Sequence, residues 1–188
     1  MHTPTAQATA AQAPARYDSV SILLHWATAA LVVLQFGSAE TWDFFPKAVR
    51  HLMIIGHMSF GVILTAVIVL RILWRLIPLH SAPAAGTELM ERAAKAMHHA
   101  LYTLIAAEVP LGFLTRWTDN HALSFFGLLI ASPFGTFSRA TGGFVDEIHD
   151  LNAWLIMILV AGHALAALYH HYLLRDDILR RMLPRQAR

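Results

Sequence analysis

Residues 149–174, HDLNAWLIMILVAGHALAALYHHYLL, form a long apolar stretch in which Asp150 is the single Asp, Glu, Lys or Arg. The stretch exceeds the roughly 20 residues that a helix needs to cross the hydrocarbon core of a bilayer. Similar stretches precede it at residues 20–38, 52–77 and 96–117. Backbone polar groups in lipid must be paired internally, and helices achieve this within one segment. We therefore predict an all-α fold, an integral membrane bundle of four helices.

The composition also indicates a membrane protein that contacts lipid. Hydrophobic residues make up 56% of the 188 positions and charged residues 14%, against about 25% charged residues in an ordinary soluble domain. The formal net charge of +2 is too small to indicate a nucleic-acid partner. The sequence has no cysteine, which excludes disulfides, iron–sulfur clusters, thiolate zinc sites and covalently attached haem.

The rest of the chain divides into a tail and one domain. Residues 1–15 are uncharged and without periodicity, which predicts a disordered tail, and residues 16–188 are expected to form the transmembrane domain. Residues 122–137 are apolar but too short to span, and glycine and proline interrupt them. We expect an interfacial or re-entrant segment there, capping one face of the bundle. Pro110 lies inside the third span and is expected to kink it.

The distribution of lysine and arginine predicts the orientation. Ten of these residues flank the N-terminal end, the second connection and the C-terminal end, namely Arg16, Arg71, Arg75, Arg92, Lys95, Arg175, Arg180, Arg181, Arg185 and Arg188. The first and third connections hold the other four, namely Lys47, Arg50, Arg116 and Arg139. Because basic residues favour the cytoplasmic side of a membrane, both termini are predicted to be cytoplasmic.

Among the 12 histidines, four on the predicted spans form pairs at two depths. His25 and His163 belong to the inner level, and His57 and His149 to the outer level. His149 and His163 are 14 positions apart (163 − 149), which is about 40° short of four helical turns and about 21 Å along the axis. One helix can thus provide a ligand to each of two stacked cofactors. Two haem b groups with imidazole on both axial sides fit this spacing and suit electron transfer.

Other interpretations of these histidines stay open. A histidine in a membrane helix can simply hydrogen-bond a neighbouring helix, although ionisable residues there are usually functional. The same side chains can bind a metal ion, but zinc sites are compact and these histidines lie at two depths. As ligands, His98 or His99 can replace a member of the inner pair, and His51 can replace His57.

Further polar groups on the spans can serve the same cofactors. Arg71, with Arg75 four residues later, can pair with haem propionates or extend to the lipid interface. His170 follows His163 by seven positions on nearly the same face. It can donate to a propionate, bind a quinone head group, or lie at the interface. Glu108 is in mid-span, where a carboxylate is costly, and is expected to be protonated or paired. No residue is assigned a catalytic role.

Several motifs resemble those of the bacterial cytochrome b561 family. They are SILLHW at residues 21–26, FFPKxxR at 44–50, IIGHMSFG at 54–61, VLRILWR at 69–75, GHALAALYHHY at 162–172 and RRMLPR at 180–185. The resemblance covers residues 16–188. It implies a four-helix di-haem protein of the bacterial inner membrane. His25 and His163 would bind the cytoplasmic-side haem, and His57 and His149 the periplasmic-side haem.

The resemblance also implies a function. Members of the family include superoxide oxidase, which passes electrons from periplasmic superoxide to ubiquinone, and His170 falls where a quinone-site histidine is expected. We therefore expect a superoxide:ubiquinone oxidoreductase with two haem b groups and ubiquinone as electron acceptor. The alternative is a haem b electron-transfer subunit for a redox protein partner, a separate dehydrogenase or hydrogenase. A haem-free metal or proton transporter is a third hypothesis.

Overall fold

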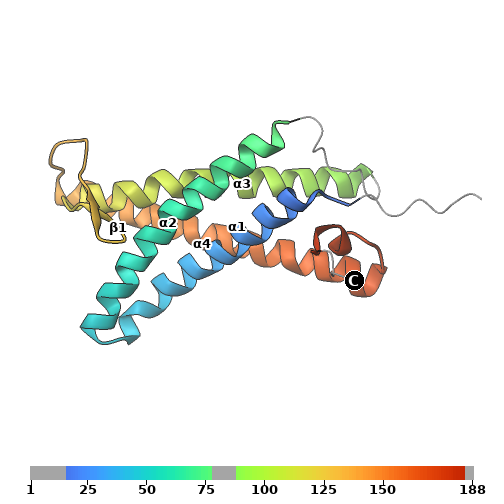
Figure 1. Ribbon diagram of the computed structural model, residues 1–188, viewed down its shortest axis with the longest axis horizontal. Helices are drawn as coiled ribbons and strands as arrows, with labels where there is room; N and C mark the ends of the chain where they lie inside the picture. The colour runs from blue at the N-terminus through green and yellow to red at the C-terminus, as the bar shows by residue number, and fades with distance from the viewer. Residues whose placement is uncertain (1–15, 78–87, 185–188) are drawn as a thin grey trace, which may run out of the picture.

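The computed structural model describes residues 16–77 and 88–184 of the chain. Its main elements are four long helices (Figure 1): α1 Ser19–Thr41, α2 Lys47–Arg75, α3 Glu88–Thr118 and α4 Arg139–Tyr169. The predicted all-α architecture of four helices is thus confirmed. The tail predicted at residues 1–15 lies outside the described residues and stays a prediction.

The helices extend beyond the predicted spans, and α1 and α4 begin at capping residues rather than at the start of an apolar stretch. The Asp18 carboxylate accepts hydrogen bonds from the N–H groups of Val20 and Ser21 at the start of α1. The Ser138 hydroxyl accepts from the Thr141 N–H and starts α4, well before the predicted span at residue 149. α3 continues through Pro110 as one helix. A 3-10 turn, η1 (Trp42–Phe44), joins α1 to α2.

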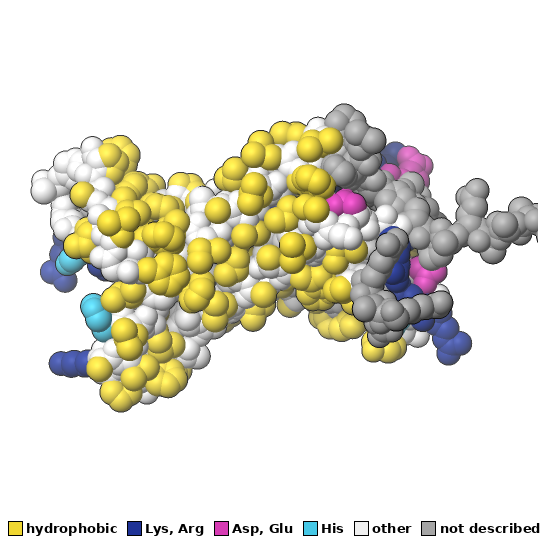
Figure 2. Space-filling view, in the orientation of Figure 1, with side chains coloured by type: hydrophobic (Ala, Val, Ile, Leu, Met, Phe, Trp, Pro, Cys, Tyr) yellow, Lys and Arg dark blue, Asp and Glu magenta, His cyan; other side chains and the backbone are white. Residues whose placement is uncertain are grey.

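The helices pack as two hairpins, α1 with α2 and α3 with α4, which cross in the middle of the molecule (Figure 1). The buried core lies at this crossing and takes a residue from each helix, namely Val32 of α1, Leu64 and Ile68 of α2, Ile105 of α3 and Ile156 of α4. Away from the crossing, many large apolar side chains are exposed. On the face shown in Figure 2, hydrophobic side chains cover the middle and most charged side chains gather at the two ends, as a bilayer requires.

Among the described residues, three segments are long and apolar enough to cross a membrane: Ser19–Phe44, Lys47–Arg75 and Arg139–Leu174. α3 has comparable length, but its polar side chains and Pro110 interrupt the apolar run. The polar residues concerned are His98, His99 and Glu108. The crossing of α3 therefore stays a prediction from the sequence.

Both described ends of the chain lie at the same end of the bundle, which we call the terminal end. The Tyr17 N–H donates to the Arg181 carbonyl at 3.4 Å, and the Trp26 indole N–H donates to the Met182 carbonyl at 2.7 Å. The connection between α3 and α4 lies at the opposite end, the hairpin end (Figure 1). The assignment of the terminal end to the cytoplasm stays a prediction.

Residues 122–137, expected as an interfacial or re-entrant segment, contain a β-hairpin that the sequence analysis missed. Strand β1 (Leu123–Phe125) pairs antiparallel with β2 (Leu128–Ile130). The turn residues Phe126 and Gly127 both have positive φ angles, 47° and 92°, as a two-residue hairpin turn requires. The β1–β2 hairpin packs on α2 and α3 and covers the hairpin end of the bundle.

Candidate functional site

The four histidines predicted as ligands form two pairs in the interior of the bundle. The ring centroids of His25 on α1 and His163 on α4 are 6.3 Å apart. Those of His57 on α2 and His149 on α4 are 6.5 Å apart. α4 is an unbroken helix between its two histidines, so the two levels are separated by about 21 Å along its axis.

These separations fit an iron ion between each pair of rings. Two metal–nitrogen bonds of about 2.0 Å, with about 1.1 Å from each nitrogen to its ring centre, place the centres about 6.2 Å apart. A direct hydrogen bond between two rings, with about 2.9 Å between nitrogens, would instead place their centres about 5.1 Å apart. The observed separations, 6.3 and 6.5 Å, are closer to the value for a shared metal ion. Their role as haem ligands stays a prediction that this geometry supports.

At the outer level, His57 is oriented by α1. Its Nδ1 lies 3.2 Å from the Gln35 carbonyl oxygen and 3.2 Å from the Ser38 hydroxyl. A carbonyl oxygen can only accept, so Nδ1 carries the proton and Nε2 is left to bind a metal. The Gln35 side chain also donates to the His57 carbonyl at 2.9 Å. The ring is thus held in the tautomer that a haem ligand needs.

His149 lies beside Glu108, which the sequence analysis expected to be protonated or paired. Glu108 Oε1 is 3.1 Å from Nδ1 of His149, but off the direction of a hydrogen bond, and this buried nitrogen bonds to none of the described residues. The Asn152 amide nitrogen donates to Glu108 Oε2 at 2.7 Å and to the Leu104 carbonyl at 3.0 Å. Glu108 is therefore paired within the bundle.

At the inner level, Arg71 contacts the first histidine of the pair. Its Nη2 lies 3.1 Å from Nδ1 of His25. A guanidinium only donates, so in this contact Nδ1 accepts and the ring proton is on Nε2. Binding a metal through Nε2 would move the proton to Nδ1 and release Arg71. The guanidinium of Arg71 also lies over the Tyr102 ring, 5.2 Å from its centroid.

The alternative ligands differ in where they lie. His98 is half-buried, and its ring centroid is 5.5 Å from that of His163, closer to the spacing of a direct ring contact. His99 is exposed and bonds the Lys95 carbonyl of its own helix at 2.7 Å. His51 is exposed on α2. Of the three alternatives, the structure brings His98 to the inner level. In the described part of the chain, no three His, Cys, Asp or Glu side chains gather closely enough to hold a metal ion.

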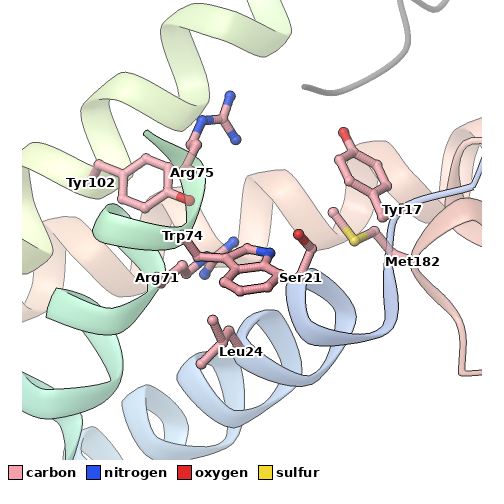
Figure 3. A pocket seen from close by; sticks show the side chains of 8 residues that line it. All are labelled: Tyr17, Ser21, Leu24, Arg71, Trp74, Arg75, Tyr102 and Met182. Atoms are coloured by element: carbon pink, nitrogen blue, oxygen red, sulfur yellow. The ribbon is translucent and has the colours of Figure 1, made fainter. Parts of the chain in front are cut away.

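A pocket opens at the terminal end, next to Arg71 (Figure 3). It encloses about 370 Å³ of space continuous with the outside and is lined by Tyr17, Ser21, Leu24, Arg71, Trp74, Arg75, Tyr102 and Met182. Burial raises the pKa of Tyr17 although Arg75 and Arg181 act to lower it, so its phenol is a neutral hydrogen-bond donor at pH 7. Of these residues, the sequence analysis proposed Arg71 and Arg75. It missed both tyrosines, since nothing in their spacing marks them.

His170 begins a π-helical turn, η3 (His170–Leu174), that continues α4. Arg175 has a left-handed backbone conformation and turns the chain back, so that the Asp176 carboxylate accepts from Nδ1 of His170. Burial acts to raise the pKa of Asp176, but hydrogen bonds from the His170 ring and the Ile178 N–H lower it overall. Nε2 of His170 is the ring nitrogen left for another partner. The sequence analysis missed Asp176, which the left-handed turn brings into contact.

Comparison with known proteins finds a match to the prokaryotic cytochrome b561 family over residues 16–185. The chain is 31% identical to cytochrome b561 homolog 2 of Escherichia coli, over 93% of this chain and 94% of that protein. It is 29% identical to cytochrome b561 homolog 1 of the same organism, over 91% and 98%. It is 27% identical to a probable superoxide oxidase of Yersinia pestis, over 91% and 97%.

Proposed function

Because the chain belongs to the prokaryotic cytochrome b561 family, a family of membrane electron-transfer proteins, we propose that it is a di-haem b-type cytochrome of the bacterial inner membrane. In this proposal it oxidises periplasmic superoxide and reduces ubiquinone. The observation that carries it is the spacing of the two histidine pairs, 6.3 and 6.5 Å between ring centroids, on a shared helix. His25 and His163 would hold one haem, and His57 and His149 the other. Haem b, when bound, supplies a reversible one-electron iron couple.

The proposed reaction balances as follows. Two superoxide anions each give up one electron and leave as two molecules of O₂. One ubiquinone takes these two electrons and two protons and becomes ubiquinol. The distribution of lysine and arginine supports superoxide entry at the hairpin end and quinone reduction at the terminal end. The choice of superoxide as donor rests on the likeness to the Yersinia pestis protein named a probable superoxide oxidase.

Residues of the terminal end have proposed roles that match their chemistry. Arg71 would pair with a haem propionate, because a guanidinium forms strong charge-assisted bonds with a carboxylate. His170 would hydrogen-bond a quinone oxygen through Nε2, since Nδ1 is already held by the ionised Asp176. The protons for quinol would reach this end from the cytoplasm.

The test begins with the purified full chain in detergent. Dithionite-reduced minus oxidised spectra should show a sharp b-type α-band, and a pyridine haemochrome assay should give about two haems per chain, as two bis-histidine sites require. His57→Ala should lower the count to about one. The matched control is His121→Ala, an exposed histidine at the hairpin end, which should keep both haems. A colourless preparation made with haem supplied would overturn the proposal.

Activity then separates the two haem-based hypotheses. If the protein is a superoxide oxidase, superoxide should reduce it rapidly and it should reduce a short-chain ubiquinone without any other protein. A haem-loaded protein that superoxide does not reduce would instead be the electron-transfer subunit of a separate dehydrogenase or hydrogenase. The β1–β2 hairpin and its flank expose four apolar side chains, namely Phe126, Leu128, Leu129 and Phe134. Contact with lipid accounts for them as well as docking of a partner protein does, so they do not separate the two roles.

A further inference from the structure

We propose that Glu108 is a positioning residue for His149, and that its carboxylate gives the haem of the outer level a lower reduction potential than the haem of the inner level. This inference rests on the proposed function, because it concerns the reduction potentials of the two proposed haems. It also explains why electrons would run from the hairpin end toward the terminal end, since they move toward the centre of higher potential.

The close approach of α3 to α4 places Glu108 against His149. Gly112 lies one turn after Glu108 on α3, and a Cβ atom there would be 3.4 Å from Cε1 of His149. An alanine methyl would just contact the imidazole, and a larger side chain at this position would push it away from α3. Glycine therefore allows the ring to lie close to the backbone of α3, within 3.1 Å of Glu108 Oε1.

Asn152 engages one oxygen of Glu108 and leaves the other facing His149. The Asn152 amide nitrogen faces the Leu104 carbonyl at 3.0 Å, and a carbonyl can only accept, so the orientation of this amide is settled. The same nitrogen donates to Glu108 Oε2 at 2.7 Å. One carboxylate oxygen is thus engaged as an acceptor, and Oε1 is left for the ring.

A metal bound to Nε2 of His149 leaves the ring proton on Nδ1, which makes Nδ1 a donor. The ring torsion is broad in energy, so a rotation of the imidazole can direct this N–H at Oε1 without moving either helix. A hydrogen bond to a carboxylate increases the basicity of the imidazole. A more basic ligand stabilises ferric over ferrous iron and lowers the potential.

His57 and His25 have partners of a different kind, which makes the effect specific to one level. Nδ1 of His57 faces the neutral carbonyl of Gln35. At the inner level, Arg71 lies beside His25. Released from the ring by metal binding, it would remain near that level as a positive charge, which favours the ferrous state. A negative group at the outer level and a positive one at the inner level shift the two potentials in opposite directions. The difference favours electron flow inward.

The experiment is a potentiometric titration of the haem-loaded full chain, followed by its α-band, for the unchanged protein and for Glu108→Gln. Asn152 and His149 face different oxygens of Glu108, and glutamine has one acceptor oxygen in place of two. The hydrogen bond to His149 or the one from Asn152 is therefore lost. We expect the lower of the two midpoint potentials to rise by about 59 mV, a tenfold shift of a one-electron equilibrium. The higher potential should stay unchanged. Glu147→Gln, which removes an exposed carboxylate of the same helix end as His149, is the matched control and should change neither.

A second measurement keeps the inference testable if Glu108→Gln does not fold. His57→Ala, which should lose the outer haem, should retain the component of higher potential. Retention of the lower component would overturn the inference, and so would two haems with unchanged potentials in Glu108→Gln. A chain that binds no haem would overturn the proposed function itself, so the haem count separates the two failures.

Discussion

The hydroxyl of Ser59 anchors the β1–β2 hairpin to α2, and its removal should open the hairpin locally. Ser59 is fully buried, with 0% exposure. Its oxygen accepts from the Phe126 N–H at 2.8 Å and donates to the Ile55 carbonyl at 2.7 Å. Ser59→Ala removes the acceptor and leaves the N–H of the turn unpaired. The same N–H can reach some water, because the Phe126 residue is 62% exposed.

The expected cost follows from that geometry. An unpaired donor in a buried position costs about 1 to 3 kcal/mol, and partial access to water places this one in the lower part of the range. A loss of about 1 to 2 kcal/mol corresponds to a roughly 5- to 30-fold larger open fraction. The amides of residues 123–130 should therefore exchange their hydrogens faster by this factor in Ser59→Ala, while those of the helix interiors keep their rates.

Hydrogen exchange followed by mass spectrometry of the detergent-solubilised protein measures this change. The matched control is Ser132→Ala, because Ser132 bonds Phe134 in the exposed part of the same connection and does not contact α2 through its hydroxyl. It should leave exchange at residues 123–130 unchanged. Equal exchange of the hairpin in Ser59→Ala and the unchanged protein would refute the assignment of Ser59 as its anchor.

Three further predictions use other contacts. His25→Ala should lower the haem count from two to about one, and His98→Ala should keep both haems. The ring centroid of His25 is 6.3 Å from that of His163, which suits a shared iron, whereas that of His98 is 5.5 Å away and does not. Loss of a haem in His98→Ala would exchange the roles of the two histidines. Gly143→Ala, in open space, should stabilise α4 by roughly 0.5–1 kcal/mol. Gly142→Ala would place its Cβ 3.1 Å from the Asp119 carboxylate and 3.4 Å from the Thr118 carbonyl, which should cancel that gain. Equal melting midpoints would contradict this. Asp176→Asn should lower the melting midpoint at neutral pH. Because the pKa of Asp176 is lowered in the folded chain, this difference should persist down to about pH 4 and fade as the pH falls further. A difference constant with pH would exclude this cause.

The four helices could be read directly from the chain. Long apolar runs such as residues 149–174 must be helical in lipid, because no other local structure pairs the backbone. Helix ends were less predictable. Ser138 starts α4 before the apolar run begins, since a cap depends on a single hydrogen bond rather than on hydropathy. The hairpin at residues 123–130 was missed because its strands of three residues are too short for a periodic pattern.

The candidate site was likewise predictable from the sequence only in part. The spacing of His149 and His163 on one helix is a property of the chain, because the rise and rotation per residue are constant in an α-helix. The partners of these two residues depend on the rotation and tilt of three other helices, and side-chain packing sets these. That packing brings His25 to 6.3 Å from His163 and the Glu108 carboxylate to 3.1 Å from the His149 ring. Close contacts of this kind arise between helices far apart along the chain, so local sequence patterns carry no record of them.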